Sequence, residues 1–265
     1  MEPGFALGSR AVAAGCALQA YDTVGSTNAE AMGLAREGRG PVWVVARAQT
    51  AGRGRRGRTW STGRGNLAAS FGVTLGVSPS VAATLGFVAG LALEQALRAV
   101  APSLALPTTR PELKWPNDVI VDGAKLAGIL LEADVSTPGR VNVVVGVGVN
   151  VAVAPEGLPY SAVSLSGRGD VATAEQLFVA LTDAFAAWFE TWDEGRGFAQ
   201  VRKGWMARAA GLGSAVSVDL GGRVARGVFE KIDDEGRLVL RAPDGTSVAI
   251  AAGEVHFGTA ATVRE

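Results

Sequence analysis

The hydrophobic and polar positions of the first hundred residues predict alternating strands and helices. Three runs of mostly apolar and β-branched residues predict strands, at residues 18–21, 42–48 and 67–75. Between the first two runs, residues 27–37 predict a helix, because Thr27 and Glu30 have capping-box spacing and Gly38 follows as a stop. A long core helix is predicted over residues 80–100, where apolar residues recur near helical spacing: Leu85, Val88, Leu91, Leu93 and Leu97.

The middle of the chain predicts further strands and then two helices. Strand-like pieces surround the turn Asp122-Gly123, a hairpin signal, and they lie at residues 113–115, 119–121 and 126–132. Residues 141–151 predict another buried strand. The spacing of apolar residues then predicts helices over residues 173–192 and 198–209.

The end of the chain has the pattern of a separate small β domain. Gly211-Leu212-Gly213 is the expected boundary, so we expect domains at residues 1–212 and 213–265. Four short β runs follow the boundary, at residues 215–219, 223–232, 238–241 and 246–251. Short strands at such spacing, joined by Gly-containing turns, are typical of a small barrel.

The composition excludes several classes of protein. The 265 residues include 25 basic and 25 acidic side chains, which excludes a generally basic nucleic-acid coat and an acidic disordered tail. One cysteine, Cys16, and one histidine, His256, disfavour zinc-cluster, thiol-protease and serine-triad chemistry. The longest apolar stretch, residues 141–154, is shorter than the about 20 residues that span a bilayer. We therefore expect a folded cytoplasmic protein without a signal peptide and without a membrane partner.

Positive charge is concentrated in one segment of the chain. Residues 38–93 contain no Asp or Glu, yet they hold seven arginines: Arg39, Arg47, Arg53, Arg55, Arg56, Arg58 and Arg64. We expect this acid-free segment to keep competing carboxylates away from an anionic ligand. Lysine is rare here, because the chain has 21 Arg but only four Lys, so a lysine beside a candidate site favours a functional reason.

The first candidate cluster is the loop at residues 49–60, in which glycine and arginine alternate. Glycine lets backbone N–H groups approach an anion closely, and arginine offers paired donors to carboxylate or phosphate. The loop lacks the Lys-Ser/Thr end of a Walker loop. We expect a loop that becomes ordered around an anionic ligand; the alternatives are a flexible surface loop and an RGG-like nucleic-acid patch.

Two further clusters lie in the strands that follow. Lys114-Trp115-Pro116-Asn117-Asp118 puts an amide and a carboxylate at a proline-fixed bend, and Lys125 opens the next apolar strand. We expect Lys125 to face a substrate; the alternative is a lysine that guards an edge strand. In Val145-Gly146-Val147-Gly148-Val149-Asn150 the two glycines indicate that a ligand or backbone lies close against the strand, with a strand bulge as the alternative.

Taken in this order, the clusters resemble the biotin protein ligases, also called biotin–[acetyl-CoA-carboxylase] ligases. The resemblance rests on Ser26-Thr27-Asn28, on the loop with Trp60, on residues 114–118 and 125–130, and on residues 146–150. It implies an α+β fold: a class II synthetase-like biotin/lipoate ligase catalytic domain, a mixed sheet flanked by helices, with a small C-terminal SH3-like β-barrel. Few residues precede the first predicted strand, so we expect the monofunctional form, without an N-terminal DNA-binding domain and without DNA as a partner.

The resemblance also implies a two-step reaction. Biotin and MgATP give biotinyl-5′-AMP and pyrophosphate, and biotin then passes to one lysine of the biotin carboxyl carrier protein domain of a biotin-dependent carboxylase. Catalytic roles are implied for Arg55, Lys125 and Asp118. Biotin contacts are implied for Ser26, Thr27, Asn28, Gln49, Gly52, Arg53, Gly54, Arg55 and Lys125, and nucleotide contacts for Arg58, Trp60, Asn117 and Asn150. No metal ligand is assigned, and the oligomeric state stays open, with a homodimer as one alternative.

The residue types suit that reaction. Two like charges about 4 Å apart repel by about 4 kcal/mol at an effective dielectric constant of about 20. Arg53, Arg55 and Lys125 are expected to neutralise this repulsion between carboxylate and triphosphate. Asp118 is expected to orient or deprotonate the acceptor lysine, or else to hold Mg²⁺. The ureido group of biotin is expected to bind Ser26, Thr27 and Gln49, with helix capping as the alternative for the first two, and residues 126–131 and 143–149 are expected to line an apolar trench.

Two other functions are alternatives. A lipoate–protein ligase shares the general fold and an adenylating lysine, but would not be expected to carry the Arg/Gly loop. A nucleic-acid-binding module that uses this loop is the alternative from a different class. At residues 257–258, where some ligases carry an arginine, the chain has Phe257-Gly258, so the part of the C-terminal domain in ATP binding stays open.

Overall fold

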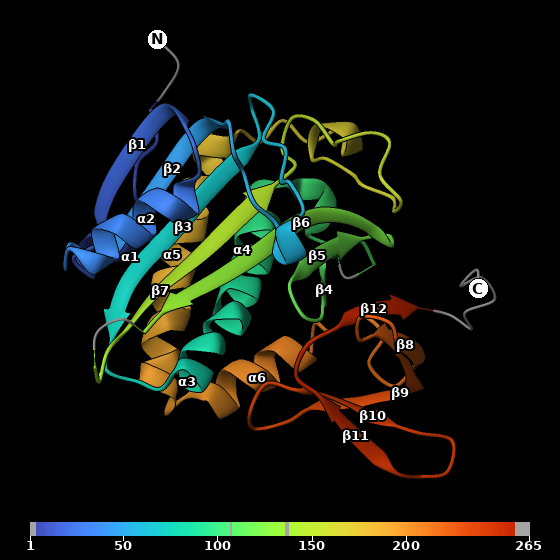
Figure 1. Cartoon of the computed structure of the whole chain (residues 1–265). Coiled ribbons are helices and arrows are strands. Elements are labelled where there is room, and N and C mark those ends of the chain that lie inside the picture. Colours follow the sequence, from blue (N-terminus) through green and yellow to red (C-terminus); the bar gives the residue numbers. More distant parts are fainter. Residues whose placement is uncertain (1–3, 107, 136–137, 258–265) are drawn as a thin grey trace.

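The larger part of the protein is a seven-stranded mixed sheet. The structure is a computed structural model that describes residues 4–106, 108–135 and 138–257. The strand order is β1-β2-β3-β7-β6-β5-β4 (Figure 1). β1 pairs with β2 in parallel, and the other neighbours are antiparallel. The strands are β1 (Ala17–Val24), β2 (Val42–Gln49), β3 (Leu67–Leu75), β4 (Glu112–Lys114), β5 (Asp118–Val121), β6 (Ala124–Asp134) and β7 (Val141–Val149).

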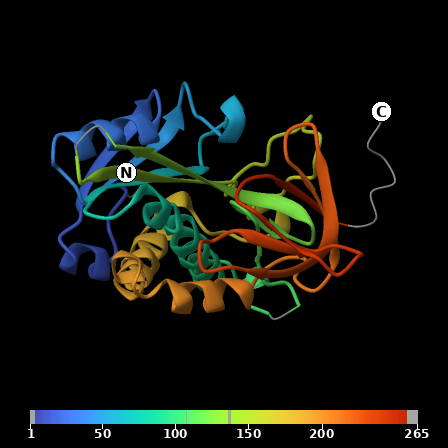
Figure 2. The ribbon, with the colours of Figure 1, turned by 60° about the horizontal axis from the view of Figure 1, so that its bottom comes forward.

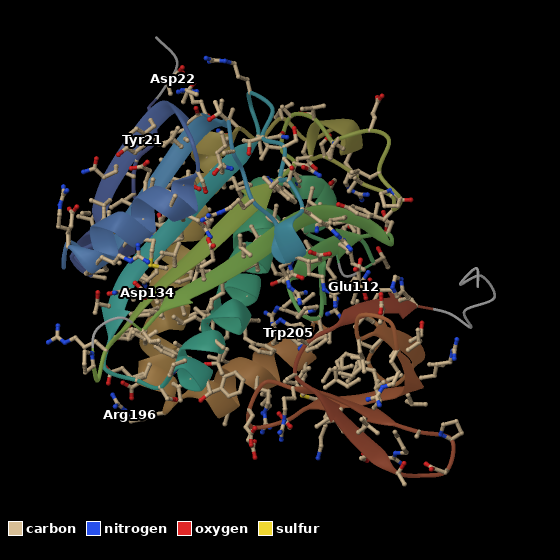
Figure 3. The ribbon with its side chains drawn as sticks, in the orientation of Figure 1. Tyr21, Asp22, Glu112, Asp134, Arg196 and Trp205 are labelled. Atoms are coloured by element: carbon tan, nitrogen blue, oxygen red, sulfur yellow. The ribbon has the colours of Figure 1, made fainter. Side chains whose placement is uncertain are left out.

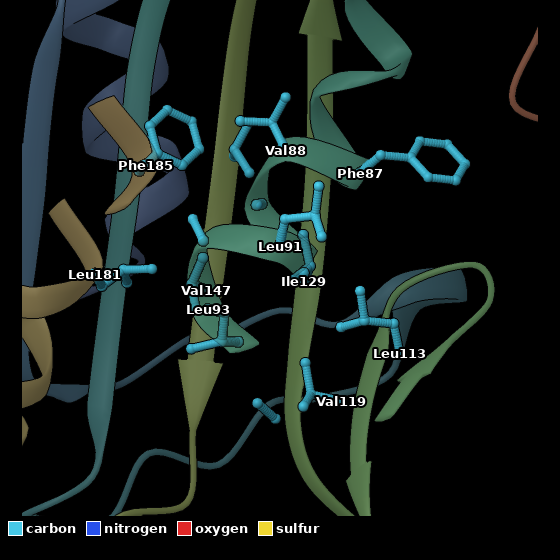
Figure 4. Packing of buried hydrophobic residues seen from close by; sticks show 14 of the residues in the cluster. Phe87, Val88, Leu91, Leu93, Leu113, Val119, Ile129, Val147, Leu181 and Phe185 are labelled. Carbon is cyan, nitrogen blue, oxygen red and sulfur yellow. The ribbon is translucent and has the colours of Figure 1, made fainter. Parts of the chain in front are cut away.

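Helices cover both faces of this sheet. α2 (Thr27–Arg36) lies on one face, where Ala31 packs with Val42, Val44 and Val144. α4 (Leu85–Val100) and α5 (Ala174–Trp192) lie on the other face over the main core (Figure 1). Figure 4 shows Leu91 and Leu93 of α4 gathered with Ile129 and Val147 of the sheet. The shorter helices are α1 (Ser9–Ala13), α3 (Pro79–Ala83) and α6 (Phe198–Met206).

The apolar stretch Pro79–Val100 is long and hydrophobic enough to cross a membrane by composition alone. Its most apolar window is 72% buried inside the protein, so it serves as core. The single helix predicted over residues 80–100 is divided at Thr84, which separates α3 from α4. Thr84 is buried there and its hydroxyl accepts a hydrogen bond from Trp192 Nε1 at 2.7 Å, which ties the division to α5.

The C-terminal part is a five-stranded antiparallel sheet beside the larger sheet (Figure 2). Its order is β11-β10-β9-β8-β12, with β8 (Ala215–Asp219), β9 (Val224–Ile232), β10 (Leu238–Arg241), β11 (Ser247–Ile250) and β12 (Glu254–Phe257). The four predicted runs are present. The pattern missed β12, whose four residues include one fully buried position, too few to show alternation.

Two local predictions differ from the structure, and two short elements were not predicted. Ser26, not Thr27, is the N-cap of α2, and no side-chain capping bond forms there, because the Thr27 hydroxyl turns to Gln49. The bulge alternative for β7 is wrong, since β7 keeps continuous register with β3 and β6. Helix α1 was not predicted. The segment after β7, for which no element was predicted, contains a short 3₁₀ helix, η3 (Ser166–Arg168). The other 3₁₀ helices are η1 (Arg55–Gly57), η2 (Pro102–Leu104) and η4 (Asp193–Gly195).

Candidate active site

A cavity lies on the sheet face that also carries α2. Its floor comes from β6 and β7, and its walls come from the start of α2, the end of β2, the Arg/Gly loop and the β4–β5 bend. Gly253, before β12, and the first two residues of β12 complete the wall from the C-terminal domain. Figure 1 shows the η1 turn of the Arg/Gly loop in front of β6 and β7. Segments distant in sequence therefore meet around one space.

One end of the cavity is a buried polar network. Gln49 Oε1 accepts hydrogen bonds from the Thr27 backbone N–H at 2.8 Å and from the Thr27 hydroxyl at 3.1 Å, while Gln49 Nε2 donates to Thr62. Ser70 Oγ lies 2.8 Å from Thr27 Oγ1 and 2.6 Å from Asn28 Oδ1. These groups hydrogen-bond to one another, so their donors and acceptors have fixed directions.

The same end contains an acid that the sequence did not point to. Glu132 Oε2 accepts hydrogen bonds from Asn28 Nδ2 at 2.7 Å and from Arg53 Nη2 at 3.0 Å. Arg53 thus reaches from the Arg/Gly loop across to β6. The guanidinium that was expected to neutralise the biotin carboxylate is paired with a protein carboxylate in this structure.

The other end of the cavity is cationic and aromatic. Lys125 Nζ lies 2.7 Å from Asp118 Oδ1, and both side chains are mostly buried. The ammonium group also lies 5.6 Å from the ring centroids of Trp60 and Tyr160. An ammonium between two aromatic faces and one carboxylate is held in place by the ion pair and by cation–π attraction.

Arginine and lysine near the β4–β5 bend are partly desolvated. Arg55 Nη1 donates to Asn117 Oδ1 at 3.0 Å, and Asn117 Nδ2 donates to the Ile129 carbonyl at 2.9 Å. Burial lowers the pKa of Arg55, with the neighbouring charge of Arg56 lowering it further. Burial also lowers the pKa of Lys114, whose ammonium lies 5.3 Å from the Phe257 ring centroid. Cations in such places attract an anion more strongly than exposed ones do.

The C-terminal domain closes one side of the site. Arg58 donates two hydrogen bonds to Glu254, at 3.3 and 2.8 Å, and Arg55 Nη1 lies 3.5 Å from the Gly253 carbonyl oxygen. The hydrogen bonds from Arg58 lower the pKa of Glu254 below its usual range and raise that of Arg58. Trp115 Nε1 also donates to the Gly236 carbonyl at 3.3 Å. The Arg/Gly loop therefore packs between the two domains.

Comparison with known proteins identifies the family. Residues 26–150 match the model described as the biotin/lipoate A/B protein ligase family, and residues 211–258 match the biotin protein ligase C-terminal domain. A biotin–[acetyl-CoA-carboxylase] ligase of Paracoccus denitrificans is 45% identical over 240 residues, which are 88% of this chain and 97% of that protein. The chain belongs to the biotin protein ligase family.

Other members of the biotin protein ligase family are also similar to this chain in sequence and in structure. The biotin–[acetyl-CoA-carboxylase] ligase of Mycobacterium tuberculosis is 40% identical over 254 residues, covering 92% of this chain and 91% of that one. The biotin protein ligase of Aquifex aeolicus in complex with biotin and ATP superposes with a TM-score of 0.74 at 25% identity, covering 91% of this chain and 97% of that chain. The expected α+β ligase fold and the ligase activity are thereby confirmed. The lipoate alternative is not favoured, because the C-terminal match and these relatives are biotin ligases.

Most residues expected to act in this biotin protein ligase are brought together. The cavity is lined by Ser26, Thr27, Asn28, Gln49, Arg53, Gly54, Arg55, Arg58, Trp60, Asn117, Asp118 and Lys125. Gly52 and Asn150 do not line it. The Gly52 carbonyl accepts a hydrogen bond from the Trp60 backbone N–H at 3.0 Å. Asn150 is buried at the end of β7, where its Nδ2 donates to the Val163 carbonyl at 3.2 Å.

Sequence reasoning missed five residues around the cavity: Ser70, Lys114, Glu132, Tyr160 and Glu254. Lys114 stands in a motif that was recognised, but it was given no role. The others carry no local signal, since each reaches the site only through tertiary contacts. The expectation that the acid-free segment keeps carboxylates away is wrong: Asp118, Glu132 and Glu254 come from other segments and lie against its arginines or against Lys125.

Proposed function

We propose that this ligase uses the cavity to join biotin to ATP and then to a carrier lysine. The observation that carries the proposal is the arrangement of one cavity with a fixed polar network at one end and Arg55 and Lys125 at the other. Biotin has the matching polarity, a ureido ring at one end and a carboxylate at the other. The relatives named as biotin–[acetyl-CoA-carboxylase] ligases support a carboxylase carrier domain as the acceptor.

In the first step a biotin carboxylate oxygen attacks the α-phosphorus of ATP, an O–P bond forms, and pyrophosphate leaves. Both reactants are anions, so the approach needs cations that are already in place. We assign this to Arg55 and Lys125, which are held by Asn117 and Asp118. Charge that spreads over the phosphoryl oxygens in the transition state then meets donors that need no reorganisation.

Asp118 holds Lys125 rather than acting as a free base in this proposal. Its Oδ1 lies 2.7 Å from the ammonium, which orients Lys125 toward the cavity between Trp60 and Tyr160. Among the described residues no group of three or more His, Cys, Asp or Glu side chains is placed to hold a metal ion. We therefore treat Mg²⁺ as part of the MgATP substrate, with its phosphates as ligands.

In the second step the amine of the carrier lysine attacks the biotinyl carbonyl, an amide forms, and AMP leaves with the bonding electrons. The amine must first lose a proton, which costs about 4 kcal/mol from a pKa of about 10.4 to pH 7.4.

Of the residues assigned to the nucleotide, Trp60 packs on Gly128 and Gly148, and in this proposal its ring contacts the nucleotide. Arg58 is instead hydrogen-bonded to Glu254.

The proposal also places this ligase in the cytoplasm and includes no DNA among its partners. Cys16 is a free thiol, as is usual in a reducing compartment. Arg53 and Arg58 are each paired with a carboxylate, which reduces the positive field that a nucleic acid would need.

If two copies of the ligase pair, we propose the edge strand β1 as the contact, and sedimentation velocity over a concentration series measures that pairing.

The deciding experiment is isotope exchange between pyrophosphate and ATP. We expect exchange with biotin, none with lipoate, and a loss of about 10²- to 10³-fold in Lys125→Met, the scale for removing one transition-state donor. Arg140→Met, at the opposite end of β6 and β7, is the control and should retain wild-type exchange. Exchange with lipoate but not with biotin would overturn the proposal.

A further inference from the structure

Glu132 is the one acid at the polar end of the cavity among the described lining and network residues, and its contacts are specific. A single oxygen, Oε2, accepts from Asn28 at 2.7 Å and from Arg53 at 3.0 Å. Asn28 Nδ2 also donates to the Leu130 carbonyl at 3.3 Å. Both protons of the Asn28 amide nitrogen therefore go to protein oxygens, and the amide cannot turn over without losing them.

The fixed amide sets the direction of the next hydrogen bond. Asn28 Oδ1 can only accept, and it lies 2.6 Å from Ser70 Oγ, which is fully buried. The single Ser70 proton therefore goes to this oxygen. Thr27 Oγ1 lies 2.8 Å from Ser70 Oγ and 3.1 Å from Gln49 Oε1, so two protein oxygens compete for its proton. The lone pairs of Thr27 Oγ1 can therefore accept a hydrogen bond from a ligand donor in the cavity.

We propose that Glu132 is a positioning residue for biotin that fixes the polarity of this chain of contacts, Glu132–Asn28–Ser70–Thr27, here called the ureido relay. The ureido relay presents an acceptor at Thr27 to a ureido N–H. The inference rests on the proposed function and adds a residue that does not contact the reacting atoms. Arg53 is held at the polar end of the cavity by its ion pair with Glu132. In this proposal Arg53 closes the Arg/Gly loop over the ureido ring of biotin and does not neutralise the biotin carboxylate.

The test separates the oxygen of Glu132 from its size. Glu132→Met keeps the length of the side chain but has no acceptor, so Asn28 and Arg53 lose their partner. Glu132→Gln keeps an oxygen that can accept from both. We expect Glu132→Met to raise the KM for biotin in pyrophosphate exchange about 5- to 150-fold, which corresponds to about 1 to 3 kcal/mol for an unpaired buried group. Its kcat at saturating biotin should stay within about twofold.

Glu132→Gln should restore the KM to within about threefold of wild type, and a calorimetric Kd for biotin should follow the same order. Ser70→Ala removes the next link and should also raise the KM without lowering kcat, which keeps the proposal testable if Glu132→Met fails to fold. Asp134→Asn is the matched control. Asp134, labelled in Figure 3, lies two residues further along β6 and pairs with Arg36 at 2.6 Å, so its substitution should leave both constants unchanged.

The outcomes distinguish this inference from the proposed function. If the wild type shows no biotin-dependent exchange, the proposed function is wrong. If the wild type is active but Glu132→Met has the wild-type KM, the ureido relay is wrong and the function stands. Glu132→Gln as impaired as Glu132→Met would likewise overturn the ureido relay, because the acceptor oxygen would then have no effect of its own.

Discussion

At the scale of single residues, two glycines of β7 make room for the site. A Cβ atom built at Gly148 would lie 2.3 Å from the Trp60 indole, and one at Gly146 would lie 2.1 Å from Asn28 Oδ1. Neither position has a backbone angle that demands glycine, so the close approach of these side chains is the reason. Gly148 leaves room for Trp60 at the Lys125 end of the cavity, and Gly146 leaves room for Asn28 of the ureido relay.

Gly148→Ala should therefore act on the nucleotide more than on biotin. The added methyl group displaces Trp60, and overpacking of this kind costs about 1 to 3 kcal/mol. We expect the KM for ATP to rise about tenfold while the KM for biotin stays within about twofold. Gly146→Ala is the paired variant and should show the reverse order. Equal effects of both variants on both substrates would contradict this division of the cavity.

At the scale of elements, the Arg/Gly loop is held by contacts rather than by regular structure. Arg53 and Thr59 form an isolated bridge, Arg56 adopts a positive φ of 56°, and the ends of the loop are tied to Glu132 and Glu254. Few backbone bonds of the loop belong to a sheet, so its opening costs less than opening a strand.

Biotin and ATP should protect this loop from trypsin. We expect cleavage after Arg53, Arg55, Arg56, Arg58 and Arg64 to slow when both ligands are present, because a bound anion adds contacts to the loop. Mass mapping of the fragments measures the effect, and cleavage after Arg140 at the far turn serves as the internal reference. Unchanged cleavage in the loop would mean that it does not close on the ligands.

The start of α5 is a second element with a testable feature. Thr173 Oγ1 accepts from the Gln176 N–H and Gln176 Oε1 accepts from the Thr173 N–H, which forms a capping box. Thr173→Ala should lower the free energy of unfolding by about 1 kcal/mol, within about 0.5 to 2, with unchanged exchange activity. Urea unfolding measures it. Thr191→Ala, near the other end of α5, is the control, since its hydroxyl bonds a carbonyl one turn back and not an unpaired N–H.

At the scale of the whole molecule, the contact between the domains is partly electrostatic. Glu254 of β12 pairs with Arg58, and the pKa of Glu254 is lowered in the folded protein. A lowered carboxyl pKa stabilises the fold at pH above the unfolded value, and that stabilisation is lost as the pH falls through the folded value.

Glu254→Gln should therefore cost stability at neutral pH but not in acid. We expect wild type to melt at a higher temperature than Glu254→Gln at pH 7, and the difference to shrink as the pH falls below about 4, the usual range of a glutamate. Glu235→Gln, exposed at the β9–β10 turn and away from the Arg/Gly loop, is the control. A difference in melting temperature that is the same at both pH values would show that the pair does not titrate as described.

The local sequence determined much of this protein. The run at residues 67–75 is β3 to the residue, the hairpin at Asp122-Gly123 joins β5 to β6, and Thr173 begins α5, because strand periodicity, turn residues and caps act over a few neighbours. Residues to which we assign the chemistry were also visible, since glycine–arginine alternation and a rare lysine can be seen in the sequence.

Only the tertiary structure decided which charges meet. Glu132 is 79 residues from Arg53, and Glu254 is 196 residues from Arg58, so no spacing in the chain could pair them. Asn150 shows the converse, because its motif indicated the nucleotide while the fold buries it against Val163. Charges and hydrogen bonds act through space at a few ångströms, and the order of strands across the sheet decides which residues come that close.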